Sequence, residues 1–178
     1  MKIFETERLV IKRLENRDKH CFSELLTDPR ILELIPQNAF TENQVTERFT
    51  KNLHLKRSDL RDRQCACGIF IKGQKELIGL ALFLINKDNE KELGYRFRVD
   101  YWGHGYGKET TKGMLRYYFE HMHVNKVTAD VNIANLGSVK ILNTFMTPVK
   151  EFFNERDNCT DRTYEITKAQ WLKQDYKQ

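Results

Sequence analysis

The sequence predicts a mixed α/β domain whose mostly antiparallel, twisted sheet has seven strands and is flanked by about four helices. Three short β-type runs joined by tight polar connections lie between residues 64 and 99. Residues 101–109, YWGHGYGKE, carry three glycines at alternate positions and lead directly into a helix-like run. A cleanly alternating strand, a further helix and two more strands follow. The expected order is therefore β-α-α-β-β-β-α-β-α-β-β.

One strand and two helices are expected before the central β-type runs, with residues 7–14 as the strand. In the first helix, Pro29 ends a helically spaced apolar pattern made by Cys21, Phe22, Leu25 and Leu26. The second helix begins at Thr41, which forms a capping box with Gln44 because each side chain can bond the other residue's backbone N–H. Residues 55–63 are highly charged and are expected to form a loop.

The central β-type runs occupy residues 64–72, 76–86 and 91–99. Their short polar connections favour an antiparallel meander. Residues 126–133 alternate between apolar and polar side chains and are predicted as a strand. Because a strand, the glycine stretch, a helix and this strand follow one another, the two strands are expected to lie parallel in the sheet.

The helix after the glycine stretch and the end of the chain complete the prediction. The helix has one apolar side, formed by Met114, Leu115, Tyr118, Phe119 and Met122. A further helix carries Leu136, Val139, Leu142 and Met146 at similar spacing. The last two strands are expected at residues 149–153 and 163–167, on either side of the turn-like segment ERDNCTD.

Length and composition describe an ordinary globular protein. The 178 residues are enough for one domain with a real core, so residues 1–178 are expected to form a single domain. A hydrophobic content of 40% with 31% charged residues is normal for a soluble chain. No apolar run approaches the roughly 18–20 residues that span a bilayer, and no signal-peptide core is present. A cytoplasmic protein without membrane partners is expected.

The net charge suggests the kind of partner, and the cysteine spacing bears on whether a metal is bound. The net charge of +5 favours an anionic partner, such as a phosphorylated cofactor, RNA or an acidic protein surface, without choosing among them. Alternation in a strand places Cys65 and Cys67 on one face as small apolar groups. No spaced cysteines or histidines complete a zinc pattern, so no metal is expected.

The glycine stretch predicts an anion site. Gly103, Gly105 and Gly107 lack Cβ atoms, so they adopt unusual backbone angles and allow a ligand to approach the main chain. The helix that follows begins with unpaired N–H groups and a partial positive charge, which suit a phosphate. Lys108 adds a full positive charge in the first turn. A plain glycine turn before a helix is the alternative, and the spacing matches neither the dinucleotide fingerprint nor a Walker loop.

The same stretch resembles the Gcn5-related N-acetyltransferase (GNAT) superfamily, in which a [Gln/Arg]-x-x-Gly-x-[Gly/Ala] loop opens a helix. Gly105-x-Gly107 fits the glycine pair, and Trp102 stands where Gln or Arg is usual. The run Tyr-Trp-Gly-x-Gly-Tyr-Gly-x-Glu is similar to the ribosomal-protein (RimJ/RimL-like) N-acetyltransferase branch. FETERLVIKRL, ELGYRF and Asn135-x-x-Ser138 also match that branch, and the resemblance extends from about Thr6 to Trp171. It implies a GNAT fold and an acetyl-CoA-dependent N-acetyltransferase.

The resemblance also implies where acetyl-CoA binds. Pantetheine would pair like an extra strand with the backbone of Tyr95, Arg96 and Phe97, and an N–H near Phe97 would polarise the thioester carbonyl. Asn135 would bond the pantetheine arm, although Asn is also a favoured helix cap. The pyrophosphate would lie on the N–H groups of Trp102, Gly103, His104, Gly105, Tyr106, Gly107 and Lys108.

Catalytic residues follow from the same resemblance. Glu92 is the first candidate for the general base, although an ordinary charged residue on a sheet face is an equal alternative. Glu109 recurs in this branch, but its place at a helix N-terminus has a sufficient electrostatic explanation. The tyrosine that many members use to protonate the departing thiolate is replaced by Leu142. Ser138 is the candidate replacement, unless it is only a small residue in the first helical turn.

The acceptor stays open at this point. The RimJ/RimL resemblance suggests a protein N-terminal amine, and a small amine such as an antibiotic or a polyamine is the alternative. A catalytically inactive module that binds CoA or RNA is a further alternative, although the aromatic residues mostly occupy apolar patterns rather than an RNA-reading surface. The oligomeric state is expected to be a monomer or a homodimer.

Overall fold

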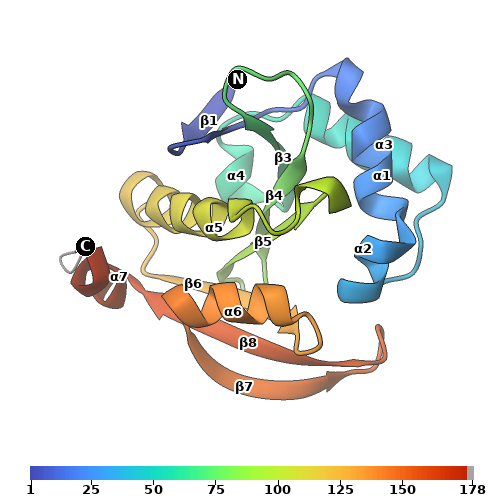
Figure 1. Cartoon of the computed structure of the whole chain (residues 1–178). Helices are drawn as coiled ribbons and strands as arrows, with labels where there is room; N and C mark the ends of the chain where they lie inside the picture. Colours follow the sequence, from blue (N-terminus) through green and yellow to red (C-terminus); the bar gives the residue numbers. More distant parts are fainter. Residues whose placement is uncertain (176–178) are drawn as a thin grey trace.

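A computed structural model describes residues 1–175 and contains one eight-stranded sheet in the order β1-β2-β3-β4-β5-β6-β8-β7 (Figure 1). The sheet is antiparallel except between β5 and β6, which confirms the predicted α/β class with a mostly antiparallel sheet. The bounds along the chain are β1 (Lys2–Glu5), β2 (Leu9–Lys12), α1 (Lys19–Thr27), α2 (Pro29–Leu34), α3 (Glu42–Leu53), α4 (Asp59–Asp62), β3 (Cys65–Ile71), β4 (Gly79–Ile85), β5 (Lys91–Phe97), α5 (Tyr106–Arg116), β6 (Lys126–Asn132), α6 (Leu136–Phe145), β7 (Thr147–Asn154), β8 (Cys159–Thr167) and α7 (Lys168–Asp175).

The strand that the sequence did not predict is β1. It lies at the N-terminus, where the sequence predicts a single strand and the structure has two, β1 and β2. β1 pairs antiparallel with β2, and the turn between them is closed by the Thr6 N–H, which donates to the Leu9 carbonyl at 2.9 Å. Ile3 is buried, so even this four-residue strand contributes to the core. A strand of this length carries too little periodic signal to be separated from its neighbour in the sequence.

Within residues 1–175 there are seven α-helices instead of about four, because three short helices were not predicted. The predicted helices correspond to α1, α3, α5 and α6. The most instructive addition is α2, which starts at the same Pro29 that was expected only to end α1. Proline is well suited to the first helical position, and the Asp28 side chain caps the helix by accepting from the Arg30 N–H at 2.9 Å. The predicted capping box of Thr41 and Gln44 is present at the start of α3.

Two apolar cores lie on the two faces of the sheet. One joins the sheet to α5 and α6 through residues such as Met114, Leu115 and Phe145. The other joins it to α1, α2 and α3, with Phe22 and Phe49 in contact at a ring separation of 5.2 Å. Figure 1 shows α5 and α6 side by side on one face, with α1, α2 and α3 grouped apart from them. Residues of one strand alternate between these two cores.

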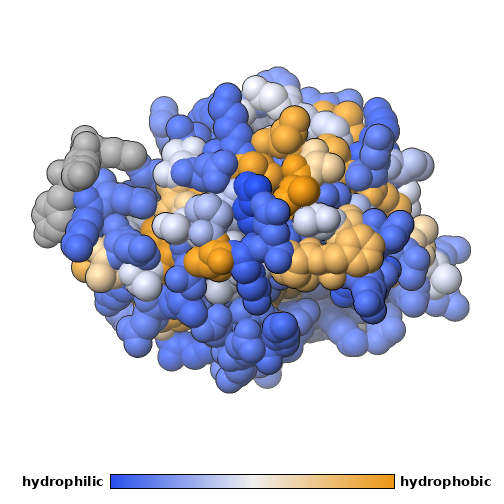
Figure 2. Space-filling model, turned by 90° about the horizontal axis from the view of Figure 1, so that it is seen from below, coloured by the Kyte–Doolittle hydropathy of each residue, from blue (hydrophilic) through white to orange (hydrophobic). Residues whose placement is uncertain are grey.

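The remaining expectations about buried cysteines and the last strands are also met. Cys65 and Cys67 are buried in the core on the α5 side, as predicted for small apolar groups. β7 and β8 form an antiparallel hairpin that is longer than the predicted strands, and β7 lies at the edge of the sheet. Seen from below, the face that carries this hairpin has hydrophobic side chains scattered among hydrophilic ones (Figure 2). No helix within the described residues is long and apolar enough to cross a bilayer.

Candidate active site

The candidate site opens where β5 and β6 separate. The two parallel strands pair only at Lys91 with Val127 and at Glu92 with Thr128. Beyond these pairs, β5 continues with β4 as its partner and β6 continues with β8. The facing edges of β5 and β6 therefore lose contact, and a cleft of about 940 Å³ lies next to this point.

The backbone of β5 presents hydrogen-bonding groups to this gap. The Arg98 N–H donates to the Ile78 carbonyl at 3.0 Å, which identifies the side of the strand that faces β4. Successive residues of a strand direct their N–H groups alternately to the two sides. Arg96 therefore bonds towards β4, whereas Tyr95 and Phe97 direct theirs to the gap. Of the three backbone positions predicted for pantetheine, two have the orientation that pairing with a ligand requires.

The glycines of the loop before α5 have distinct roles. Gly103 and Gly105 adopt left-handed φ angles of 77° and 80°, which L side chains rarely adopt. Gly105 is the N-cap of α5 and no side chain caps this helix, so its first N–H groups keep their capacity to bind an anion. A Cβ on Gly103 would meet no atom within 4 Å, whereas one on Gly107 would lie 2.9 Å from Ile141 Cδ1. Gly107 thus permits the close approach of α5 to α6.

Aromatic and imidazole side chains of the loop contact the loop itself. The Trp102 Nε1–H donates to the Phe97 carbonyl at 2.9 Å. His104 Nδ1 lies 2.8 Å from the Trp102 carbonyl, and its ring stacks on that of Tyr106 at 5.7 Å. These contacts hold the loop against the end of β5. An anion at this loop would therefore meet main-chain N–H groups and Lys108, which is exposed.

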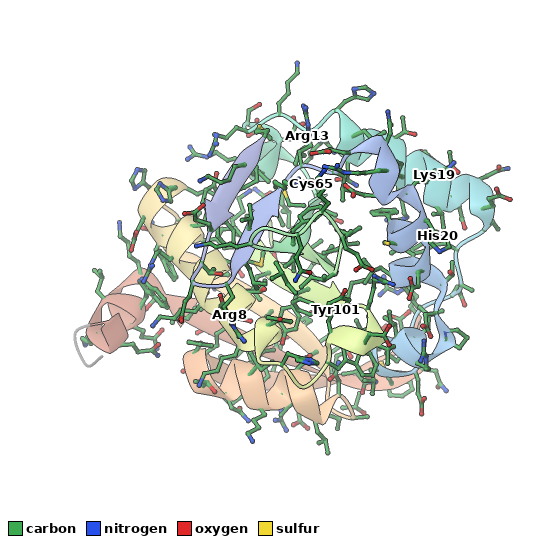
Figure 3. All side chains as sticks on the ribbon, turned by 45° about the horizontal axis from the view of Figure 1, so that its top comes forward. Arg8, Arg13, Lys19, His20, Cys65 and Tyr101 are labelled. Atoms are coloured by element: carbon green, nitrogen blue, oxygen red, sulfur yellow. The ribbon has the colours of Figure 1, made fainter. Side chains whose placement is uncertain are left out.

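Arg8 and Glu109 connect this loop to the first two strands. The Glu109 carboxylate accepts from the Thr6 hydroxyl at 2.6 Å and from both the backbone N–H and the Nε–H of Arg8 at 2.7 Å. Arg8 also donates to the His104 carbonyl at 3.0 Å, and its guanidinium lies 4.7 Å from the centre of the Tyr106 ring. Figure 3 shows Arg8 beside the glycine loop. Glu109 is thus a structural anchor of the loop, and it does not line the cleft.

Glu92 lines the cleft at the point where β5 and β6 part. Burial, and to a smaller extent the neighbouring negative charge of Asp130 on β6, raise the pKa of its carboxyl to about 7. Asp130 is oriented by the Thr163 hydroxyl, which donates to it at 2.6 Å. A carboxyl with a pKa near 7 can accept a proton at neutral pH and is therefore suited to act as a general base.

The start of α6 places two further predicted residues at the cleft. Asn135 is the N-cap of α6, and its side chain accepts from the Ser138 N–H at 3.1 Å while its amide donates to the Leu34 carbonyl at 3.4 Å. Asn135, Ser138 and Leu142 all line the cleft. Leu142 is buried, so the position where many GNAT members carry a tyrosine is apolar here.

Tyr95 brings a hydroxyl to the same region that the sequence does not point to. This hydroxyl is buried and has no hydrogen-bond partner of good geometry within residues 1–175. Burial raises the pKa of Tyr95, and the nearby hydroxyls of Ser138 and Thr111 oppose the rise. Its side chain thus adds a second proton-bearing group next to Ser138.

The cleft brings together part of the predicted site. Glu92, Tyr95, Arg96, Asn135 and Ser138 line it, whereas Phe97 and the glycine-loop residues 102–108 lie outside its lining. Among residues 1–175 no group of His, Cys, Asp or Glu side chains is arranged to hold a metal ion. Sequence reasoning missed the side-chain contacts of Arg8 and Asp130. For Arg8 a signal existed in the FETERLVIKRL segment, whereas the contact of Asp130 with Thr163 depends on the folded sheet.

The comparison with protein families finds a match over most of the chain. The family model described as an acetyltransferase (GNAT) domain matches residues 8–145. The chain is also 24% identical over 178 residues to the uncharacterized N-acetyltransferase p20 of Bacillus licheniformis, covering 99% of each sequence.

Solved structures share the fold at low sequence identity. An acetyltransferase (GNAT family) from Bacillus anthracis has a TM-score of 0.79 and 22% identity, covering 95% of this chain and 99% of that one. The RimL ribosomal L7/L12 alpha-N-protein acetyltransferase in complex with coenzyme A has a TM-score of 0.75 and 13% identity, covering 94% and 98%. The spermidine N-acetyltransferase from Vibrio cholerae in complex with CoA and spermine has a TM-score of 0.76 and 18% identity, covering 93% and 98%.

Proposed function

The chain belongs to the GNAT acetyltransferase family and is an N-acetyltransferase, and from this premise we propose that it moves the acetyl group of acetyl-CoA directly to an N-terminal amine of a protein or peptide. The observation that carries the proposal is the position of Glu92, a carboxyl with a pKa of about 7 at the point where β5 and β6 separate. RimL, which shares the fold, is a ribosomal-protein alpha-N-acetyltransferase.

The described residues fit acetyl-CoA. The gap between β5 and β6 exposes backbone N–H groups of Tyr95 and Phe97, which an amide-bearing pantetheine arm can match. The uncapped first turn of α5 and the left-handed Gly103 and Gly105 form a cradle for a pyrophosphate. Lys108 supplies a positive charge beside it. When bound, acetyl-CoA supplies an acetyl thioester.

Each of three residues at the site then performs one step of the acetyl transfer. Glu92 takes a proton from the ammonium of the acceptor, directly or through water, so that the amine nitrogen can attack the thioester carbonyl. The Phe97 N–H stabilises the negative charge that develops on the carbonyl oxygen. Ser138 donates its hydroxyl proton to the departing thiolate. A C–N bond forms and the C–S bond breaks. The proton that the nitrogen loses as the amide forms restores the Ser138 hydroxyl, and Glu92 releases the first proton to solvent.

Donor binding is tested by thermal melting with and without acetyl-CoA. A ligand at about 100 times its dissociation constant stabilises by roughly 2.7 kcal/mol, which corresponds to a rise of roughly 5–10 °C for a chain of this size. Gly105→Val should abolish the rise. Gly73→Val is the matched control, because Gly73 has a φ of 79° and open space around it but lies in the turn between β3 and β4.

Acceptor identity is tested by mass spectrometry of acetylated products. Peptides with a free N-terminal amine should be acetylated, and peptides with a blocked N-terminus should not. Spermidine is the probe for the small-amine alternative, which the structural similarity to a spermidine N-acetyltransferase suggests. If spermidine were acetylated and no peptide were, the proposed acceptor class would be wrong, although the acetyl-transfer activity would stand.

A further inference from the structure

Arg96 carries a buried positive charge without a counter-ion. Arg96 is 8% exposed, and its side chain points to the face of the sheet that α1, α2 and α3 cover. One terminal nitrogen donates to the Leu25 carbonyl at 3.2 Å and the other to Gln37 Oε1 at 3.4 Å. Both partners are neutral, and no carboxylate forms an ion pair with Arg96 among the described residues.

Two donors at this position also lack partners. The Nε–H of Arg96 and the Nε2 amide of Gln37 are buried and have no hydrogen-bond acceptor within residues 1–175. Leaving a buried donor unpaired is costly, and buried guanidinium groups are normally paired with an anion. Since Gln37 already accepts from Arg96, the two unpaired donors belong to neighbouring side chains. An anion near both would pair the charge and the two donors at once.

Arg96 lines the same cleft as Glu92 and lies on the same face of β5. The two residues are four positions apart, which corresponds to about 13 Å between Cα atoms in a strand. The wall beside Arg96 is formed by Leu34, Ile35 and Pro36, the end of α2 and the segment after it. The glycine loop precedes α5, which packs on the opposite face. Arg96 is therefore on the side of the acceptor and not of the pyrophosphate.

We propose that Arg96 and Gln37 form an anion-binding subsite for the acceptor, so that the preferred acceptor is a peptide with a carboxylate within its first few residues. This inference rests on the proposed function and names its substrate class. The amine lies near Glu92 and Asp130, and the carboxylate accepts from the Arg96 Nε–H and the Gln37 amide. A free α-amino acid is too short to reach both ends. A polyamine has no group for the subsite and brings positive charge towards Arg96.

The direct test compares pairs of amide-capped tetrapeptides that differ only in Asp or Asn at the third or fourth position. A hydrogen-bonded charged pair predicts a preference of roughly 10–100-fold in kcat/KM for the Asp peptide of at least one pair, expressed mainly in KM. Equal kcat/KM values within both pairs would overturn the subsite. Calorimetric binding of the same peptides in the presence of CoA gives a second readout that does not need turnover.

Removing the buried Arg96 side chain could destabilise the fold. A variant that adds a carboxylate beside Arg96 tests the subsite without removing this side chain. Gln37→Glu places a carboxylate against Arg96, so it should raise the melting temperature and remove the preference for Asp over Asn. Asn38→Asp makes the same change of charge at an exposed neighbouring position and should leave the preference intact. Arg96→Gln should also remove the preference. In Gln37→Glu and Asn38→Asp the stabilisation by acetyl-CoA should match that of the wild type.

The outcomes separate this inference from the proposed function. If peptides are acetylated without regard to the carboxylate, the subsite is refuted and the N-terminal acetyltransferase remains. If no amine is acetylated but the Asp peptide binds more tightly than its Asn partner, the subsite stands and the proposed function fails. If Gln37→Glu retained the full preference for Asp, Arg96 would not be the group that recognises the carboxylate.

Discussion

Arg8 and Glu109, 101 residues apart in the sequence, are joined by two hydrogen bonds of 2.7 Å, one from the backbone N–H of Arg8 and one from its Nε–H. The Thr6 hydroxyl adds a third donor to the same carboxylate. Burial raises the pKa of Glu109, but these hydrogen bonds outweigh it and hold the pKa below its usual value. The contact attaches the start of β2 to the first turn of α5, and Arg8 extends it to the His104 carbonyl of the glycine loop.

Replacing Glu109 with Gln should therefore weaken acetyl-CoA binding more than it slows the chemical step. Loss of the charged acceptor frees Arg8 and loosens the loop, so KM for acetyl-CoA should rise roughly tenfold while kcat changes little. Steady-state kinetics with varied acetyl-CoA measures this. Glu120→Gln is the control, because Glu120 is exposed and its contact with Arg116 is a weak surface pair at 3.8 Å. A loss of kcat at unchanged KM in Glu109→Gln would instead indicate a catalytic role.

Glu92→Gln should lower kcat by roughly 10²–10⁴-fold, because the amide cannot accept the proton of the acceptor. The wild-type kcat/KM should rise with pH up to about 7, where the carboxyl of Glu92 loses its proton, and should level off above it. Asp130→Asn should shift this limb to lower pH, because the charge of Asp130 raises the pKa of Glu92. Asp161→Asn, which also lies at the cleft, should leave the limb in place. A pH limb that survives in Glu92→Gln would assign it to another group.

The stability of the fold should respond to the same carboxyl. The pKa of Glu92 is about 4.5 in the unfolded chain and about 7 in the folded protein. The unfolded state therefore loses this proton first, and the free energy of unfolding falls as the pH rises from about 4.5 to about 7. Glu92→Gln removes this effect. Its melting temperature should exceed that of the wild type at pH 8, and the difference should shrink at pH 5. A difference that is independent of pH would contradict the raised pKa.

Ser138→Ala should lower kcat by roughly 10²-fold if Ser138 protonates the departing thiolate, with KM for acetyl-CoA little changed. Tyr95→Phe should retain both kcat and the melting temperature, because the hydroxyl it removes has no hydrogen-bond partner of good geometry. The two variants are compared under acetyl-CoA saturation. The opposite result, with Tyr95→Phe inactive and Ser138→Ala active, would assign the proton donor to Tyr95.

Local sequence patterns predicted those parts of the fold that depend on neighbours along the chain. The capping box at Thr41, the meander of β3, β4 and β5, and the parallel pairing of β5 with β6 all follow from periodicity and connection length. Pro29 predicts the end of α1, but proline also begins helices, and only the Asp28 cap reveals α2. β1 is too short for its pattern to be distinguished.

By itself, the sequence indicated the family through the resemblance of its motifs, and it determined the α/β class and the glycine loop because these depend on contiguous residues with local backbone preferences. Only the tertiary structure decided how side chains on separate strands act on one another. The pKa of Glu92 depends on burial and on Asp130 across the gap, and the unpaired charge of Arg96 is apparent only once α1 and Gln37 surround it. Desolvation and Coulomb interactions depend on the distances between groups in space. These distances cannot be read from the separation of residues along the sequence.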